Sequence, residues 1–187
     1  GSGIAVAAYY GVSVHVPQKK KAPRKYEWKG SSLALAWSPD ATYIATGEQD
    51  STVHFWHRKS GEDSQMSGYP SKVKELSWDK TGRWLATGGS EAVCIWDCSS
   101  PGPAGRQPLL YPGHSAKLTQ VAFQPDGELL ASTDAESVLL LWDPINKKDA
   151  LDGGKLSSPA SCLRWVSGGK LAVGLRDGDI AVFTTET

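Results

Sequence analysis

The chain has 187 residues, enough for one sizeable hydrophobic core or two small ones. Hydrophobic residues make up 40% and charged residues 21%, as in ordinary folded proteins, and 20 basic residues offset 20 acidic ones. A chain without net charge exerts no whole-molecule attraction on nucleic acid or anionic lipid, and none of its apolar runs approaches the roughly 20 residues of a membrane span.

The first predicted elements are three short strands. Residues 4–8 and 12–16 are mostly apolar and flank a turn at Tyr9-Tyr10-Gly11, and residues 24–28 form the third strand. We interpret them as the last three strands of a four-stranded unit.

A basic loop, residues 19–25, precedes the third strand. Its cations offer a surface for nucleic acid or anionic lipid. A solvated loop is the favoured interpretation, because no aromatic residues are interleaved and the rest of the chain is neutral. The basic residues concerned are Lys19, Lys20, Lys21, Arg24 and Lys25.

Four similar segments follow along the chain. One aromatic series recurs at intervals of 41, 45 and 42 residues, and a second at intervals of 40, 46 and 41. A period of roughly 40–45 residues is typical of propeller blades, each a small sheet of four short strands. The first series is Trp37, Trp78, Phe123 and Trp165, and the second is Trp56, Trp96, Trp142 and Phe183.

The best-preserved segment lies between Leu109 and Asp143. It predicts strands over 109–111, 117–123, 129–132 and 138–142. Pro125-Asp126-Gly127 predicts a tight turn, because Pro fixes one dihedral angle and Gly accepts a positive one. The run 138–142 is almost wholly apolar, as expected of a strand covered on both faces.

This segment resembles the repeat of the WD-repeat propeller family. The resemblance rests on Gly113-His114, Pro125-Asp126-Gly127, Leu130-Ala131-Ser132 and Leu141-Trp142-Asp143. In that family a His, a Ser or Thr, an Asp and the Trp are linked within each blade by hydrogen bonds. By position the resemblance places His114, Ser132, Glu136 and Trp142 in this tetrad, with Glu136 where the family prefers Asp.

The other segments match the tetrad only in part. The resemblance assigns Thr46, Asp50 and Trp56 to one blade. It assigns Thr87 and Trp96 to the next, with Ser90 or Glu91 standing in for the Asp. The last segment keeps Asp177 but has Val173 in place of Ser and Phe183 in place of Trp.

The predicted fold class is therefore an all-β propeller of the WD-repeat type, with about four and a half blades present. The predicted blades are residues 4–28 (three strands), 32–67, 72–111, 117–152 and 161–184 (three strands). We interpret the chain as the C-terminal part of a seven-bladed ring whose remaining blades are absent or supplied by another chain. The alternative is a small propeller that closes on itself.

The resemblance implies a non-enzymatic scaffold that binds protein partners through loops displayed on one rigid face. Tyr and Arg are frequent anchors in such interfaces. The candidate partner-binding residues are Lys29, Gln49, Tyr69, Lys72, Glu91, Lys117, Ala135 and Arg176.

No catalytic, cofactor or metal constellation is found in the sequence. His54 and His57 lie three residues apart on one predicted strand, so they point to opposite faces and cannot grip one metal together. An accessory protein of an enzyme or of a metal-handling system is kept as an alternative, because propellers are often associated with enzymes.

The three cysteines, Cys94, Cys98 and Cys162, are an odd number within or beside apolar runs. Buried free thiols in a reducing compartment are the favoured interpretation. We therefore expect an intracellular, cytoplasmic protein.

Overall fold

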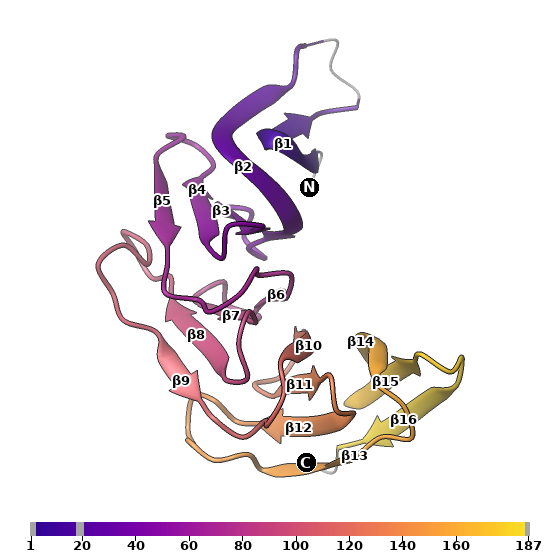
Figure 1. Cartoon of the computed structure of the whole chain (residues 1–187). Coiled ribbons are helices and arrows are strands. Elements are labelled where there is room, and N and C mark those ends of the chain that lie inside the picture. Colours follow the sequence, from indigo (N-terminus) through magenta and orange to yellow (C-terminus); the bar gives the residue numbers. More distant parts are fainter. Residues whose placement is uncertain (1–2, 18–20, 186–187) are drawn as a thin grey trace.

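The computed structural model describes residues 3–17 and 21–185, and these ranges form sixteen strands (Figure 1). None of the described residues lies in a helix long and apolar enough to cross a membrane. The strands are β1 (Ile4–His15), β2 (Arg24–Trp37), β3 (Tyr43–Glu48), β4 (Val53–His57), β5 (Asp63–Met66), β6 (Leu76–Trp78), β7 (Trp84–Thr87), β8 (Val93–Asp97), β9 (Leu109–Tyr111), β10 (Leu118–Phe123), β11 (Leu130–Asp134), β12 (Val138–Trp142), β13 (Asp152–Lys155), β14 (Ala160–Val166), β15 (Lys170–Leu175) and β16 (Ile180–Thr184).

Neighbouring strands pair antiparallel in the order of the chain, so each sheet is a simple meander. We call these sheets blades 1 to 5. Blade 3 contains β6–β9, blade 4 contains β10–β13 and blade 5 contains β14–β16. The long strand β2 belongs to two blades: its residues 24–31 pair with β1 to make blade 1, and its residues 32–37 pair with β3 to begin blade 2, which ends with β5.

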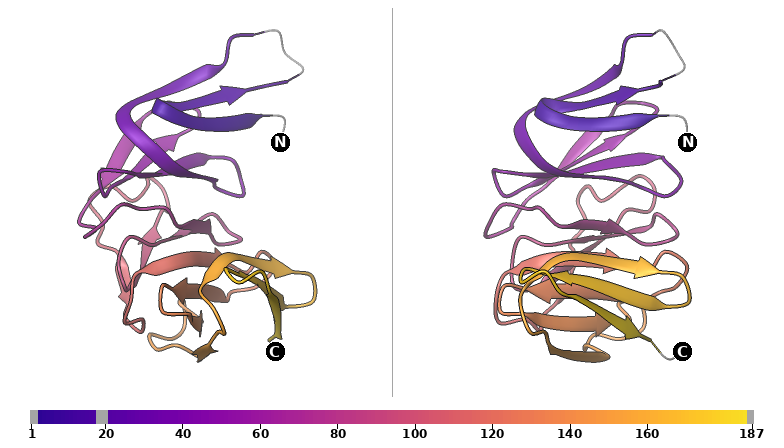
Figure 2. Two further views of the ribbon diagram at one scale, coloured as in Figure 1. Left: turned by 45° about the vertical axis from the view of Figure 1, so that its right-hand side comes forward. Right: turned by 90° about the vertical axis from the view of Figure 1, so that its right-hand side faces the viewer.

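Strand β1 contains a reversal of the chain, visible at the indigo end of Figure 2. Tyr10 and Gly11 both have positive φ angles, 73° and 113°. A side-chain carbon built on Gly3 would lie 3.3 Å from Val14 Cγ1, whereas eleven extended residues would span about 36 Å. Gly11 must lack a side chain, because a Cβ there would overlap the Tyr26 carbonyl oxygen.

The blades are arranged side by side in an open arc (Figure 1). The first strands of the blades, β2, β6, β10 and β14, contact one another in succession along its concave side. The last strands β5, β9 and β13 lie along its outer side, and β1 and β16 lie at opposite ends. This radial stacking of four-stranded meanders is a partial β-propeller.

The hydrophobic core is divided among the spaces between adjacent blades. Strands β3 and β11 are buried along their whole length, as expected of inner strands covered on both faces. Four separate clusters result, one at each junction between consecutive blades. Each blade is therefore stabilised by its neighbours rather than by a core of its own.

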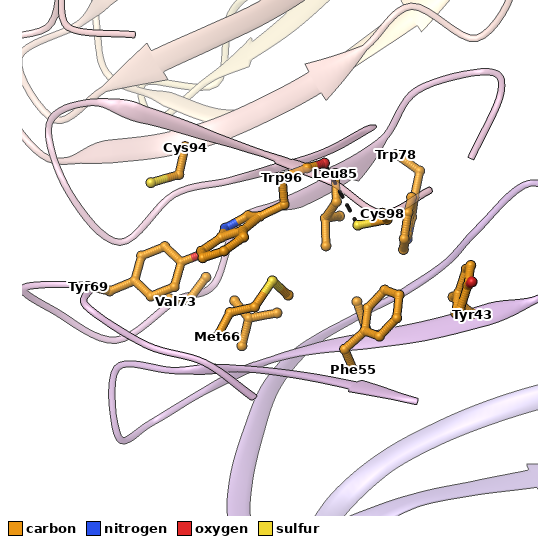
Figure 3. Packing of buried hydrophobic residues seen from close by; sticks show 12 residues of the cluster. Tyr43, Phe55, Met66, Tyr69, Val73, Trp78, Leu85, Cys94, Trp96 and Cys98 are labelled. Atoms are coloured by element: carbon orange, nitrogen blue, oxygen red, sulfur yellow. Dashed lines mark hydrogen bonds between the residues drawn. The ribbon is translucent and has the colours of Figure 1, made fainter. Parts of the chain in front are cut away.

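Figure 3 shows the cluster between blades 2 and 3. Phe55 and Met66 from blade 2 face Trp78, Leu85 and Trp96 from blade 3. The rings of Phe55 and Trp78 lie 6.0 Å apart between centroids, within the range of favourable aromatic pairs. Apart from Phe183 in the last blade, the aromatic residues of both repeat series thus fill the spaces between blades.

Two predicted boundaries differ from the structure. The fourth blade extends to Lys155 rather than ending at residue 152, because β13 pairs with β12 from Leu141↔Asp152 to Val138↔Lys155. The fourth strand of this blade was expected, but Gly153 and Gly154 give it a weak sequence signal, so its end was placed too early. The predicted strand 24–28 is joined to the start of the predicted blade 32–67, because β2 continues from one blade into the next without a turn.

Candidate functional site

The face formed by the second-to-third-strand turns carries the candidate site. These turns are residues 49–52, 89–92, 135–137 and 176–179, and together with the segments 67–75, 112–117 and 156–159 we call them the loop face. Ser51, Ser137 and Gly178 each lie five residues after Thr46, Ser132 and Val173, and each has a positive φ angle, between 66° and 100°. Three turns of the loop face therefore share one backbone geometry.

Backbone hydrogen bonds fasten the loop face within and between blades. Within blades 2, 4 and 5 the N–H groups of Gln49, Ala135 and Arg176 donate to carbonyls just before the first strand, at 2.9 to 3.0 Å. Between blades, the Val73 N–H donates to the Glu48 carbonyl at 3.2 Å, and the Leu118 N–H donates to the Ser90 carbonyl at 3.0 Å. A surface fixed in this way loses little backbone entropy on binding.

Below the loop face, blade 4 contains a buried network of four side chains. The Trp142 indole N–H donates to Ser132 Oγ at 2.8 Å, and Ser132 Oγ lies 2.7 Å from His114 Nε2. The other ring nitrogen of His114 lies 3.0 Å from Asp134 Oδ2. Asp134 Oδ1 accepts the N–H groups of Glu136 and Val138, so the same carboxylate also holds the turn.

The placement of Glu136 in this network is wrong. Glu136 is exposed, and Asp134 occupies the acidic position. The reason is where the strand ends: residues 132 and 134 lie on the same face of β11, which ends at Asp134, so both side chains point toward His114, whereas Glu136 lies beyond the strand in the exposed turn. Burial lowers the pKa of His114, and its contact with Asp134 opposes that effect.

Blade 3 contains a different network, built on a tyrosine. The Trp96 indole N–H donates to the Tyr69 hydroxyl at 2.7 Å (Figure 3), and that hydroxyl lies 2.8 Å from Thr87 Oγ1. Tyr69 is 8% exposed, so its assignment as a partner-binding residue is wrong. Burial raises the pKa of Tyr69, which keeps the phenol neutral.

Neither Ser90 nor Glu91 takes part in the network of blade 3. This corrects the prediction that one of them stands in for the Asp of the tetrad. Ser90 Oγ accepts the Ala92 N–H at 3.1 Å and donates to the Ala92 carbonyl, so it closes a local turn. Glu91 is exposed. The position two residues after Thr87 is Gly89, and a hydroxyl-based network needs no carboxylate.

Blade 2 places a glutamate at the acidic position. Glu48 is fully buried, and its Oε1 accepts hydrogen bonds from Thr46 Oγ1 at 2.6 Å and Ser32 Oγ at 2.9 Å. The assignment of Asp50 is wrong, because Asp50 is exposed and accepts the Thr52 hydroxyl within the turn. Trp28 stacks on His54 with ring centroids 4.0 Å apart.

Blade 5 has no such network among the described residues. Val173 is buried and Phe183 is 39% exposed, and neither side chain can form a hydrogen bond. The assignment of Asp177 is wrong, because its Oδ1 accepts the Asp179 N–H within the exposed turn.

A sequence signal for these networks exists and was missed. Trp28, Tyr69 and His114 each precede the Ser or Thr of their blade by 18 residues. Likewise Glu48 and Asp134 each follow it by two residues. A search for an acid two residues after the Ser or Thr, still within the strand, would have selected these two residues over Asp50 and Glu136, which follow it by four and lie in exposed turns.

The remaining predicted partner-binding residues lie at or beside the loop face. The structure separates them by exposure: Lys72 and Lys117 are half-buried, and the others are exposed. Lys117 Nζ donates to the Lys72 carbonyl at 3.4 Å, which brings these two residues together. The exposed set is Lys29, Gln49, Glu91, Ala135 and Arg176.

A hollow of about 710 Å³ lies against the first strands on the concave side of the arc. Residues of β2, β6, β10 and β14, or directly beside them, contribute to its wall. Its charged lining residues are Lys74, Glu75, Lys117, Arg164 and Arg176. The hollow therefore combines four cations with one carboxylate.

The candidate metal and basic-loop residues have ordinary structural contacts. His54 Nε2 lies 2.9 Å from Asp63 Oδ2, and His57 Nδ1 lies 2.8 Å from Ser60 Oγ. Across residues 3–17 and 21–185, no three His, Cys, Asp or Glu side chains are grouped to hold a metal. Arg24 donates to the Lys59 carbonyl at 2.9 Å, whereas Lys19 and Lys20 lie outside the described residues.

Three segments of the chain match the family model described as WD domain, G-beta repeat. The matched residues are 24–57, 63–97 and 105–143, more than half of the chain. The chain belongs to the WD40 repeat family. Each match covers the last strand of one blade and the first three strands of the next, so the sequence repeat is offset from the blade by one strand.

Several curated proteins are similar to this WD40 chain. The Arabidopsis thaliana protein "Cell division cycle 20.1, cofactor of APC complex" is 28% identical over 63% of the chain and 25% of its own length. "Pre-mRNA-processing factor 19 homolog 2" of the same plant is 28% identical over 80% of the chain and 29% of its own length. The chain thus spans about a quarter of the length of these relatives.

A solved structure has the same fold. A chain from "Crystal Structure of Mitotic Checkpoint Complex" superposes with a TM-score of 0.82 at 22% identity, over 97% of this WD40 chain and 58% of that chain. At that identity the likeness shows the fold alone. It agrees with the partial propeller described above.

Proposed function

We propose that this WD40 chain is a non-enzymatic scaffold that binds protein partners through the loop face. The supporting observation is the set of backbone hydrogen bonds that ties the turns to the first strands and joins adjacent blades. A preorganised surface of this kind favours binding because its backbone order already exists before the partner arrives. The family match agrees with an interaction module, and the printed name of one relative describes a cofactor of a complex.

Site-specific photo-crosslinking tests this proposal. A photoreactive phenylalanine analogue is placed at Gln49, Glu91 or Ala135 on the loop face. We expect these positions to form covalent adducts with proteins of the source cell, detected by mass spectrometry and reproducible across the three sites. The same partners recovered equally from the opposite edge of the blades would contradict the assignment of this face. The matched control positions are Asp40, Lys80 and Asp126, exposed residues of the first-to-second-strand turns.

We also propose that the remaining blades of the ring come from further sequence or from another chain. The arc is open in Figure 1, and the chain spans only part of the relatives and of the solved chain that it matches. Blade 5 has three strands, so β16 offers a free edge for a fourth strand. The mass of the native protein tests this: a native subunit of only 187 residues that forms no complex would contradict it.

An intracellular, cytoplasmic location is proposed on the state of the cysteines. Cys94 and Cys98 are buried free thiols, and Cys162 is an exposed free thiol. Burial raises the pKa of Cys94 to about 11, so this thiol is held neutral and unreactive. An exposed unpaired thiol is typical of a reducing compartment.

A further inference from the structure

We propose that the hollow on the concave side of the arc binds an acidic, extended protein segment through Lys74, Lys117, Arg164 and Arg176. This inference rests on the proposed function and names the chemistry of the partner. Twenty basic and twenty acidic residues balance over the whole chain, whereas four cations and one carboxylate line the hollow. The positive charge is therefore concentrated locally.

The four cations are not neutralised within the protein. Across residues 3–17 and 21–185, the ion pairs involve other residues, and none includes Lys74, Lys117, Arg164 or Arg176. Arg164 and Lys117 donate instead to the carbonyls of Leu163, at 2.9 Å, and Lys72, at 3.4 Å. These bonds leave the positive charge of both side chains available, because a carbonyl oxygen carries no formal charge.

The single carboxylate of the hollow is turned toward the protein. Glu75 Oε2 accepts the Lys74 N–H at 3.3 Å and lies against Gly88, where a Cβ would overlap that oxygen. Burial raises the pKa of Glu75, and the Lys74 N–H and the charge of Lys117 lower it in part. The Gly88 backbone thus holds Glu75 in place, where its carboxylate interacts with the charges of Lys117 and Lys74 and not with those of the two arginines.

Acidic residues near the hollow do not cancel its charge. Glu91 and Glu136 lie in turns of the loop face outside the lining of the hollow. Asp177 follows Arg176, but its carboxylate accepts the Asp179 N–H at 3.2 Å in its own turn. These residues would instead restrict the acidic segment to the hollow by repelling it from the turns.

The lining favours a protein segment over a nucleic acid. Among the described residues, no Trp, Tyr, Phe or His lines the hollow, so nucleobases would find no stacking platform. Between the cations lie short apolar and hydroxyl side chains, including Leu76, Thr119 and Val121. Such surface suits a peptide on which Asp or Glu side chains alternate with small or apolar ones.

Fluorescence anisotropy with labelled probes tests the inference on the full chain. The probe is a Glu/Asp-rich peptide of about 12 residues, or about 40 Å when extended. The binding of this peptide is compared with that of its Gln/Asn analogue and of a single-stranded oligonucleotide of similar length. We expect the acidic peptide to bind at least about fivefold more tightly than either, with affinity falling as salt rises.

Charge-reversal variants locate the site. Arg164→Glu combined with Arg176→Glu should weaken binding of the acidic peptide by about tenfold or more, because two attractive charges become repulsive. The matched control is Lys147→Glu with Lys148→Glu, which makes the same change of net charge in an exposed loop after β12 and should leave binding within about twofold. Arg176→Lys should retain binding, and thermal melts of each variant establish that it is folded.

The possible failures are distinguishable. Equal binding of the acidic and neutral peptides, or equal loss in the control variant, would overturn the acidic preference while leaving the loop-face crosslinks intact. Tighter binding of the oligonucleotide would overturn the choice of a protein segment. Failure of the crosslinking experiment would instead contradict the proposed function itself.

Discussion

In blade 4 the tetrad forms a chain of donors and acceptors that runs in one direction. Trp142 donates to Ser132, the Ser132 hydroxyl donates to His114, and the second ring nitrogen of His114 donates to Asp134 when the imidazole is neutral. All four side chains of this network are buried, and each of their polar atoms has a hydrogen-bond partner. Removing one member therefore leaves a buried neighbour unpaired, and this costs more than the lost bond alone.

Substitution of the two acidic residues distinguishes the true tetrad member. Asp134→Ala should lower the free energy of unfolding by about 2–4 kcal/mol, because His114 and two turn N–H groups lose their acceptor. Glu136→Ala, on an exposed side chain, should change it by less than about 0.5 kcal/mol. Urea denaturation followed by tryptophan fluorescence measures both. A larger effect at Glu136 would restore the sequence-based assignment.

The buried imidazole of His114 should make stability depend on pH. Burial lowers its pKa in the folded state below the unfolded value of about 6.5, so the unfolded chain binds the proton more readily. Stability from the neutral imidazole is therefore full above about pH 6.5 and is lost as the pH falls, by up to about 1.4 kcal/mol per pH unit. The pKa of His54 is lowered in the same way and should add to the effect.

Urea denaturation between about pH 7.5 and 5.5 checks this expectation. His114→Gln should reduce the slope of unfolding free energy against pH. Leu85→Ala is the control, because it destabilises the protein by removing a fully buried side chain but keeps both histidines. An unchanged slope in His114→Gln would show that His114 does not contribute to the pH dependence.

The role of a residue in the buried network could be predicted from the sequence only where its residue type allows few alternatives. Trp142 and His114 carry polar atoms on large rings, and burial makes a partner necessary. The choice between Asp134 and Glu136, or between Glu48 and Asp50, depends on where the strand ends. Asp134 and Glu48 are the last residues of β11 and β3, whereas the other two lie in exposed turns, and repeat alignment alone did not place that boundary.

At the scale of the element, β16 differs from the third strands of the other blades. In blades 2, 3 and 4 the third strand is covered by a fourth, whereas β16 is the edge of a three-stranded sheet. Ile180 is 75% exposed and Val182 is 59% exposed. An apolar edge strand of this kind is a template for pairing with another strand.

Charged substitutions in β16 should therefore reduce self-association of the chain. Ile180→Lys combined with Val182→Lys places two like charges on the edge and disfavours pairing with a second copy. Sedimentation velocity across a range of concentrations should show a larger monomer fraction than in the unsubstituted chain. Ile145→Lys, in the exposed loop after β12, should have no such effect. Equal association in all three proteins would place the contact elsewhere.

At the scale of the whole molecule, the hydrophobic contacts that stabilise the fold lie between blades. Each of the four clusters joins two consecutive blades, so the loss of one interface weakens the arc at one junction. Leu163 is fully buried in the cluster between blades 4 and 5. It is the most direct place to test whether blade 5 depends on its neighbour.

Leu163→Ala should lower the free energy of unfolding by about 2–5 kcal/mol and release blade 5 first. Limited proteolysis should then cleave within residues 160–184 before it cleaves β3 or β7. The conservative Leu163→Met should retain most of the protection, because it keeps the buried volume. Simultaneous cleavage of all blades would show that the arc unfolds as one unit.

The sequence by itself determined the repeat, the strand-rich blades and the aromatic residues between them. These features follow from local rules: hydrophobic periodicity, turn chemistry and the need to bury indole rings. Only the tertiary structure decided that Tyr69 is internal, that Asp134 and Glu48 are the buried acids, and that four cations share one hollow. These facts depend on which side chains meet across strands and blades, and that proximity is fixed by register and radial packing rather than by position in the chain.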